Sequence, residues 1–183
     1  AKIQLSYVIN AFLIGLTFTF IAFFISIIFI VATGGSLLSF EQMLKVSGLL
    51  ILTVSLASAM NMLFVLFTNT LSAFSTLSTI IGTIIGFLAG VYVPIGALPT
   101  FAQNLIMVFP ISHSSLLLRD VFMAESINKV FAGAPVEFIE QYKITYGVIY
   151  EMNGTTLSTT TSLAVIIGSI FIFSLFAIKK KKK

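Results

Sequence analysis

The chain has 183 residues, of which 58% are hydrophobic and 9% are charged. Soluble domains carry about 25% charged residues, so this composition excludes an ordinary soluble protein. The net charge of +4 does not indicate nucleic-acid binding, because five of the ten basic residues form one terminal run, Lys179–Lys183, with no aromatic residues among them.

Three long segments, residues 3–40, 46–118 and 152–178, contain no Asp, Glu, Lys or Arg. An apolar helix of about 20 residues is long enough to cross the hydrocarbon layer of a membrane. The sequence therefore predicts an all-α integral membrane protein with a single transmembrane domain over residues 1–183. We expect a polytopic helix bundle with about four transmembrane helices and a short re-entrant helical segment on the outer side.

The first span is expected at about residues 8–32. Ser39-Phe40-Glu41-Gln42 has the spacing of a capping box, so a second helix should begin there and become the span at about 46–67. After the polar turn 68–70, a third span is expected at about 71–93 and a fourth at about 157–178.

The segment 94–110 is apolar, but Pro94, Pro99 and Pro110 interrupt it, and Leu98 directly precedes the second proline. A helix from Thr100 to Phe109 would be about 15 Å long, half of the hydrocarbon thickness. We expect this segment to enter the membrane and return, or to lie at its surface. The spacing Thr100 to Gln103 repeats the capping-box pattern at its start.

An outer loop is expected over residues 111–156. A short helix is predicted within it at 114–125, followed by a loop of mixed polarity at 126–156. Asn153-Gly154-Thr155, near the end of this loop, matches a glycosylation acceptor.

Orientation follows from the basic residues, because the cytoplasmic flanks of membrane helices are enriched in Lys and Arg. The run Lys179–Lys183 predicts a cytoplasmic carboxyl end anchored beside anionic lipid headgroups; an engineered tail is the alternative. Four crossings then place Lys2 in the cytoplasm as well, and the segment 94–156 outside. Lys45 falls on the outer side and argues weakly against this orientation.

Four small residues, Ser78, Gly82, Gly86 and Gly90, recur every four positions in the third predicted span. This spacing places them on one helix face, where backbones in lipid approach each other closely. Two interpretations stay open: packing against another helix of the same subunit, and a subunit interface or moving contact in a transport cycle.

Asn61 lies in the middle of the second predicted span, where burying an unpaired amide costs on the order of a few kcal/mol. A hydrogen bond to another helix is the favoured expectation, and a wet cavity is the alternative. His113 is the only histidine and is expected at the membrane interface. Arg119 should pair with Asp120 at a helix end, or meet anionic headgroups of lipid or cargo.

Motifs for chemistry are missing from the sequence. It contains no cysteine, no glycine-rich run ending in Gly-Lys-Ser/Thr, and no charged residue inside the predicted spans. Three serines flank His113, but catalysis would also need a positioned nucleophile and an orienting carboxylate. We therefore predict no catalytic, cofactor-binding or metal site, no enzyme activity of its own, and no proton or sodium relay.

Residues 87–99 read Phe-Leu-Ala-Gly-Val-Tyr-Val-Pro-Ile-Gly-Ala-Leu-Pro, and Phe109-Pro110-Ile111-Ser112-His113 and Leu117-Leu118-Arg119 follow. This order of elements resembles the permease subunit of type-2 ABC exporters. In that family the fifth span ends in Gly-x-x-x-Pro and Leu-Pro, and a short re-entrant pair, a Pro-x-(Ser/Thr)-(His/Tyr) element and Leu-Arg lead to the last span. The similarity covers residues 39–119, and the last span by position.

The resemblance implies that the four predicted spans are the family's third to sixth. The first two spans and the coupling helix that meets the ATPase would then be absent. It further implies a multi-pass permease of a bacterial cytoplasmic membrane that exports a hydrophobic or amphipathic cargo such as a drug, antimicrobial, lipid or glycan. Its expected partners are an ATP-binding cassette ATPase subunit, a second permease subunit in a homo- or heterodimer, and membrane lipid. The alternative is a non-transport scaffold or sensor whose outer loop, residues 126–156, binds a ligand.

Overall fold

The computed structural model describes residues 2–68, 70–152 and 155–180. The last three lysines and the first two residues of the predicted glycosylation acceptor lie outside them. Most of the described chain is helical, and its two strands have two residues each. In chain order its elements are α1 Lys2–Ala32, α2 Phe40–Phe67, α3 Leu71–Leu88, the 3-10 helix η1 Ile95–Ala97, α4 Thr100–Val108, α5 Pro110–Val130, α6 Val136–Thr145, β1 Glu151–Met152, β2 Thr155–Thr156 and α7 Thr159–Lys180.

Within the described residues, four helices, α1, α2, α3 and α7, are long and apolar enough to cross a membrane. The charge-free segments therefore predict the all-α architecture and its four long apolar helices correctly. The third helix ends at Leu88, five residues before the predicted 93, because the chain turns at Ala89 and Gly90 rather than at Pro94.

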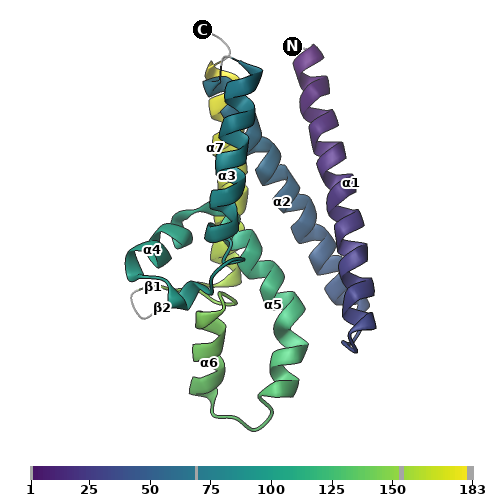
Figure 1. Cartoon of the computed structure of the whole chain (residues 1–183), viewed down its shortest axis with the longest axis vertical. Helices are drawn as coiled ribbons and strands as arrows, with labels where there is room; N and C mark the ends of the chain where they lie inside the picture. The colour runs from purple at the N-terminus through teal and green to yellow at the C-terminus, as the bar shows by residue number, and fades with distance from the viewer. Residues whose placement is uncertain (1, 69, 153–154, 181–183) are drawn as a thin grey trace.

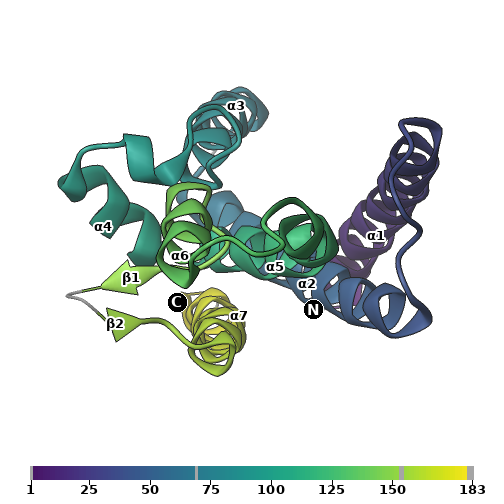
Figure 2. The ribbon, with the colours of Figure 1, turned by 90° about the horizontal axis from the view of Figure 1, so that it is seen from below.

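Helix α2 lies at the centre of the bundle and packs against α1, α5 and α7 (Figure 2). Residues from α2, α4, α5 and α7 form most of the core, including Leu56, Ile106, Leu117 and Ile166. Helix α3 stands to one side of α2, and Leu88 at its end is its one buried residue. The bundle is therefore well packed around α2 and loosely packed along α3.

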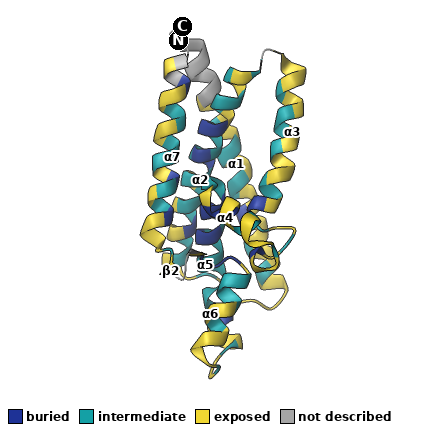
Figure 3. Cartoon of the chain, turned by 90° about the vertical axis from the view of Figure 1, so that its left-hand side faces the viewer, coloured by how far each residue is buried: buried dark blue, intermediate teal, exposed yellow. Residues whose placement is uncertain are grey.

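Helix α1 begins and α7 ends at the same end of the molecule, while α6 lies at the other end and α4 lies about midway between the two (Figure 1). An even number of long helices accounts for this arrangement. Exposed positions run along the lengths of α3 and α7 (Figure 3). Large apolar side chains are also exposed on α1 and α7, such as Phe18 of α1, 69% exposed, and Phe171 of α7, 66% exposed. Apolar surface of this extent is stable in a lipid environment and not in water.

Helix α2 begins at the predicted capping box. Ser39 Oγ accepts a hydrogen bond from the backbone N–H of Gln42 at 3.2 Å, and Gln42 Oε1 accepts one from the backbone N–H of Ser39 at 2.8 Å. Both bonds satisfy N–H groups that have no partner within the helix. The capping-box prediction at residues 39–42 is confirmed.

Replacing Ser39 by Ala should lower the free energy of unfolding by about 1 kcal/mol, because one N-terminal N–H loses its acceptor. Thermal unfolding in detergent micelles measures this loss. Ser26→Ala is the control, because the Ser26 hydroxyl bonds back to Ala22 of its own helix and its removal should have little effect. Equal losses in the two variants would contradict the assigned cap.

The second predicted capping box, at Thr100–Gln103, is wrong. Pro99 occupies the N-cap position of α4 and Thr100 is already helical, so no side-chain oxygen is available to cap the helix. Gln103 Nε2 instead donates to the carbonyl oxygen of Leu98 at 2.8 Å. Leu98 and Pro99 thus form the junction between η1 and α4, and Pro94 is the N-cap of η1.

Helices α4 and α5 meet at a bend of 92°. Pro110 is the first residue of α5, a position where proline costs no helical hydrogen bond. The outer loop predicted over 111–156 is mostly helical, with α5 reaching residue 130 and α6 covering residues 136–145. The helix predicted at 114–125 is confirmed but is longer than expected. The loop predicted at 126–156 is wrong where α5 continues and α6 forms, because polar residues along these helices hide their helical pattern.

Candidate functional site

His113 lies in a hydrogen-bonded cluster that ties the α4–α5 bend to the start of α7. Its Nε2 lies 2.8 Å from the carbonyl oxygen of Met107, and its Nδ1 lies 3.1 Å from Ser162 Oγ. Because a carbonyl oxygen can only accept, Nε2 carries the proton and Ser162 donates to Nδ1. His113 is 1% exposed. The ring is therefore enclosed by protein, while the predicted place of His113 at the level of the membrane interface stays a prediction.

Tyr150 covers this cluster from the segment just before β1. Its ring meets the His113 ring edge-on with centroids 5.7 Å apart, and its hydroxyl donates to the carbonyl oxygen of Ser112 at 3.0 Å. Burial raises the pKa of Tyr150, so the phenol keeps the proton that this bond requires. Ser112 Oγ lies 2.5 Å and 2.6 Å from the carbonyl oxygens of Ile106 and Phe109, and so bonds across the bend.

A hydroxyl hydrogen-bonded to an imidazole is also the arrangement that activates a nucleophile. Here Ser162 is 0% exposed, so a substrate has no access to its hydroxyl. All four polar side chains of the cluster have partners, as buried polar groups in a stable structure require. We therefore interpret Ser112, His113, Tyr150 and Ser162 as a clamp that fixes the α4–α5 bend against α7, and call them the histidine clamp.

Arg119 holds the end of α3. Its Nη2 donates to the carbonyl oxygens of Ala89 and Gly90 at 2.6 Å and 2.8 Å, and Ser115 Oγ donates to Ala89 at 3.0 Å. The last carbonyl groups of a helix lack partners within it and carry partial negative charge, so a guanidinium stabilises this end. The ion pairs between described residues do not include Arg119 or Asp120, and the predicted pair between them is wrong.

Two glycines make room for the Arg119 guanidinium. Gly90 has φ +65° and Gly147 has φ +67°, and a Cβ at either position would lie 3.1 Å or 3.0 Å from Arg119 Nη1 and closer still to the Ile95 side chain. Nη1 is buried and has no hydrogen-bond partner among the described residues. We call Gly90, Ile95, Arg119 and Gly147 the arginine slot; it joins α3, η1, α5 and the end of α6.

Replacing Gly147 by Ala should lower the free energy of unfolding by about 2–4 kcal/mol, because left-handed backbone strain adds to overpacking against Ile95. Thermal unfolding in micelles measures the loss. Gly133→Ala is the matched control: Gly133 has φ +85°, but no atom lies within 4 Å of the position of its Cβ. Backbone strain alone should cost that variant about 1–2 kcal/mol. A loss for Gly147→Ala no larger than the control's would contradict the slot.

The four small residues near α3 do not form one continuous packing face. Gly86 lies beneath the Tyr92 ring, which leaves no space for a Cβ. Gly90 lies beyond the end of α3, so the predicted face is wrong at that position. Gly82 has no atom within 4 Å of the position of its Cβ, and it lines an open crevice together with Ser78.

This crevice, of about 200 Å³, lies between α2 and α3, and we call it the α2–α3 crevice. Asn61 is exposed in it and forms no hydrogen bond with another described residue, so the predicted interhelical bond is not made. Ser78 Oγ is buried and also lacks a partner within the described ranges. The other walls are apolar and include Met60, Phe64 and Ile81.

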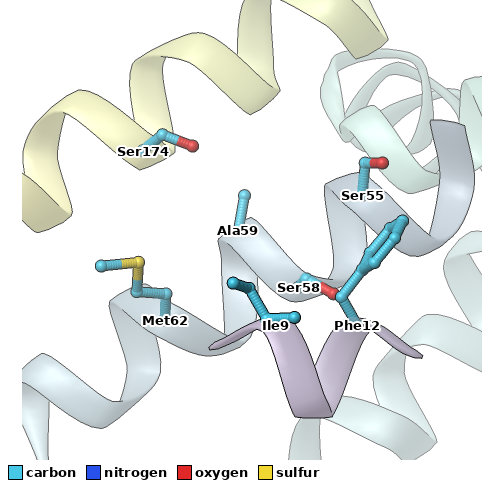
Figure 4. A pocket seen from close by; sticks show the side chains of 7 residues that line it. All are labelled: Ile9, Phe12, Ser55, Ser58, Ala59, Met62 and Ser174. Carbon is cyan, nitrogen blue, oxygen red and sulfur yellow. The ribbon is translucent and has the colours of Figure 1, made fainter. Parts of the chain in front are cut away.

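A second crevice, of about 230 Å³, opens on another side of α2, where α1 and α7 approach it (Figure 4). Its lining includes Ser55 and Ser58 of α2 and Ser174 of α7. The Ser55 hydroxyl donates to Ile51 of its own helix at 2.7 Å, and serine in a helix can generally satisfy its hydroxyl in this way. The Asn61 amide has no such bond to its own helix among the described residues. The α2–α3 crevice is therefore the stronger candidate for a site that binds a polar group.

Metal binding finds no support in this geometry, because no three His, Asp or Glu side chains of the described residues are placed to hold an ion. Comparison of the chain with family models, with curated proteins and with solved structures found no match.

Proposed function

We propose that this chain is the membrane-spanning permease subunit of an ATP-driven exporter, and that it forms part of the pathway for a hydrophobic or amphipathic cargo. The observation that carries the proposal is the incomplete closure of the bundle between α2 and α3. A purely structural bundle would be expected to pair the Asn61 amide in the apolar interior. Instead, Asn61 and Ser78 stand unpaired beside an open crevice within the described chain.

The order of elements supports the same function. Helix α3 is followed by η1, the short helix α4 and a bend of 92° into α5, which is the order that the type-2 ABC exporter resemblance implies. Because α1 begins and α7 ends at one end of the molecule, we propose that α4 and α5 form a re-entrant pair and not a fifth crossing. The lysines at the end of α7 then favour a cytoplasmic location for that end.

The energy source must come from a partner. Residues 46–118 contain no ionisable carboxylate or amine, so this core of the bundle offers no ordinary ion relay. A separate ATP-binding cassette ATPase would supply the energy, and a second permease subunit would complete the pathway. A bacterial cytoplasmic membrane is the location that the resemblance favours.

Co-expression of the permease gene with a neighbouring ATPase gene, followed by affinity purification from membranes, tests this proposal. We expect the two subunits to co-purify, and inverted vesicles containing both to accumulate cargo only with ATP. An ATPase variant that lacks the phosphate-binding lysine of its P-loop is the control. It should abolish uptake without dissociating the complex. An intact, functional protein that purifies without any ATPase would contradict the proposal.

A scaffold or sensor is the second candidate, and the tip of the α5–α6 hairpin favours it. Val130, Val136 and Phe138 are 77%, 65% and 69% exposed, and they lie at the end away from the chain termini (Figure 1). Exposed apolar groups at such a place are typical of a partner surface. The double variant Phe138→Ser with Val136→Ser should abolish partner binding if the tip of the hairpin is the binding surface of a scaffold or sensor. It should leave ATP-driven uptake unchanged if the chain is a permease.

A further inference from the structure

The crevice between α1, α2 and α7 is a wedge that opens toward the end of the molecule where the chain termini lie. We call it the α1–α2–α7 crevice; its lining includes Ile9 and Phe12 of α1 and Ser174 of α7. Helices α1 and α2 meet closely at Gly15, where a Cβ would lie 3.3 Å from Val54 Cγ1. Ile9 and Phe12 lie six and three residues nearer the start of α1, and α1 separates from α2 in this direction (Figure 1). The crevice is therefore closed at Gly15 and open toward the termini.

The walls of this crevice suit a hydrocarbon chain. No charged side chain lines its volume of about 230 Å³. Ser55 already donates to Ile51 of its own helix, and Ser58 and Ser174 can turn their hydroxyl groups to a carbonyl oxygen of the preceding turn in the same way. No group in the lining therefore needs a polar ligand, while an empty space would cost the lining atoms their dispersion contacts. In a bilayer, an acyl chain is the group at hand to fill such a space.

Positive charge without a counter-charge lies at the open mouth. Lys179 is exposed and lies five residues after Ser174 on α7, and Lys2 is the first residue of α1, seven residues before Ile9. At 1.5 Å per residue, the lining begins about 7–10 Å from these positions, and the headgroup layer on each side of the hydrocarbon is about 5–8 Å thick. No Asp or Glu occurs in residues 1–40, 46–118 or 152–183, the segments that reach this end. An anionic headgroup at the mouth would therefore supply the missing charge while its acyl chain enters the crevice.

A second copy of the chain is the main alternative, because another helix could cover the crevice instead. A copy in the same membrane orientation would bring its own Lys2 and Lys179–Lys183 to the same level, and neither chain has an acidic residue there to pair with them. The like charges would repel each other. A lipid without net charge would fill the space but leave the lysines without a counter-charge. An anionic phospholipid supplies both the chain and the charge, and such lipids bind basic pockets between membrane helices.

We infer that the α1–α2–α7 crevice binds an acyl chain of an anionic phospholipid, whose phosphate lies at the mouth where Lys2 and Lys179 supply positive charge. The lipid belongs to the leaflet at the end of the molecule that carries the chain termini. It fills the space between α1, which packs chiefly on α2, and α7. This site does not depend on the proposed export function.

The composition allows a clean test, because the chain contains no tryptophan. The Phe12→Trp variant places one fluorophore in the crevice wall. Phe176→Trp places one at the same end of the molecule but outside the crevice, at a residue of α7 that is 66% exposed. Each variant is reconstituted into nanodiscs of phosphatidylcholine. Phosphatidylglycerol or phosphatidylcholine with dibrominated stearoyl chains is then added as the quencher.

We expect quenching of Phe12→Trp by the phosphatidylglycerol to saturate. Half-saturation should occur at a mole fraction about tenfold lower than for the phosphatidylcholine, since each lysine near the headgroups attracts an anionic lipid severalfold. Quenching of Phe176→Trp should rise without saturating and with a much smaller preference for the anionic lipid, because general attraction to the lysines acts there without a seat for the chain.

Filling the crevice tests the seat of the acyl chain. The Ser174 side chain points away from α7 into the crevice (Figure 4), so adding Ser174→Leu to Phe12→Trp should remove the saturable part of the quenching. Gly168→Leu is the matched control on the same helix. No atom lies within 4 Å of the position of the Gly168 Cβ, and Gly168 does not line the crevice, so saturation should be unchanged.

Neutralising the mouth tests the recognition of the headgroup. Lys2→Gln with Lys179→Gln should remove most of the preference of Phe12→Trp for phosphatidylglycerol. Lys45→Gln with Lys143→Gln is the matched control, because it changes the net charge equally at the opposite end of the molecule, and it should leave the preference unchanged. A cooperative thermal unfolding transition in each variant shows that it is folded.

Quenching of Phe12→Trp that never saturates, or saturation that survives Ser174→Leu, would overturn the site. Equal saturation by the two lipids would overturn the recognition of an anionic headgroup. The same saturation at Phe176→Trp would show that the lysines gather anionic lipid without a seated chain, and would also reject the site. Absence of quenching by either lipid, in nanodiscs that hold two copies of the chain, would show that a second copy covers the crevice.

Discussion

Replacing His113 by Ala is expected to destabilise the protein by about 3–5 kcal/mol. The substitution leaves a cavity beside the Tyr150 ring and removes the partners of Met107 O and Ser162 Oγ. The cost of the cavity and the cost of two unsatisfied buried groups add. Thermal or denaturant-induced unfolding in micelles measures the loss.

Two companion variants separate the hydrogen bonds of His113 from its packing. Ser162→Ala combined with His113→Ala should cost less than the sum of the two single losses by about 1 kcal/mol or more, because the two side chains share a bond. Ser114→Ala is the control: Ser114 is the next residue and 2% exposed, but its hydroxyl has no partner among the described residues. It should be neutral or slightly stabilising. Additive losses for His113 and Ser162 would contradict the histidine clamp.

Replacing Arg119 by Met should lower the free energy of unfolding by about 2–3 kcal/mol. The variant keeps much of the apolar stem, but it loses charge-assisted hydrogen bonds to the carbonyl groups of Ala89 and Gly90. It also loses the favourable interaction of a cation with the carboxyl end of α3. The expected result is a lower unfolding temperature, together with faster proteolysis near residues 89–97.

Lysine at position 119 should recover part of this stability, because it restores the charge but cannot reproduce the planar fork of donors. Lys129→Met is the matched control for the loss of a cation on the same helix. Lys129 pairs with Glu125 at 2.6 Å, with its side chain 64% exposed, and such pairs contribute about 0–1 kcal/mol. If Arg119→Met is no more destabilising than Lys129→Met, the arginine slot does not hold the end of α3.

The long helices were predictable because a simple physical requirement determines them. A charge-free apolar segment of membrane-spanning length has few other stable structures, and α1, α2 and α7 follow it closely. The capping box at Ser39 is equally local, since both of its hydrogen bonds join residues three positions apart. At Thr100 the same pattern does not form a capping box, because Pro99 occupies the N-cap position of α4 and has no side-chain oxygen.

The candidate sites were less predictable, because they depend on residues far apart in the chain. His113 bonds to Ser162, which lies 49 positions away, and Arg119 bonds to carbonyl groups about 30 positions away. Nothing local distinguishes Tyr150 or Ser162 from other residues of their type. Gly147 carries a local signal, since a glycine just after a helix commonly ends it in a left-handed conformation.

Asn61 and Ser78 illustrate the reverse case. Their polarity within apolar helices was evident from the sequence, but the bond expected for Asn61 depended on how closely α3 packs. The structure leaves α3 with one buried residue, Leu88, and the α2–α3 crevice is the consequence. The loose packing of α3 was not predictable, because its small residues suggested a close contact.

Cysteine labelling tests the membrane arrangement most directly, because the chain has no cysteine of its own. Single variants Lys2→Cys, Lys179→Cys and Ala132→Cys, the last in the turn between α5 and α6, would be exposed to an impermeant maleimide in intact cells and in inverted vesicles. Four crossings with a re-entrant α4–α5 pair predict labelling of Ala132→Cys in cells, and of the two terminal variants only in inverted vesicles. Labelling of Lys2→Cys and Lys179→Cys from opposite faces, or of all three variants from the same face, would contradict the account.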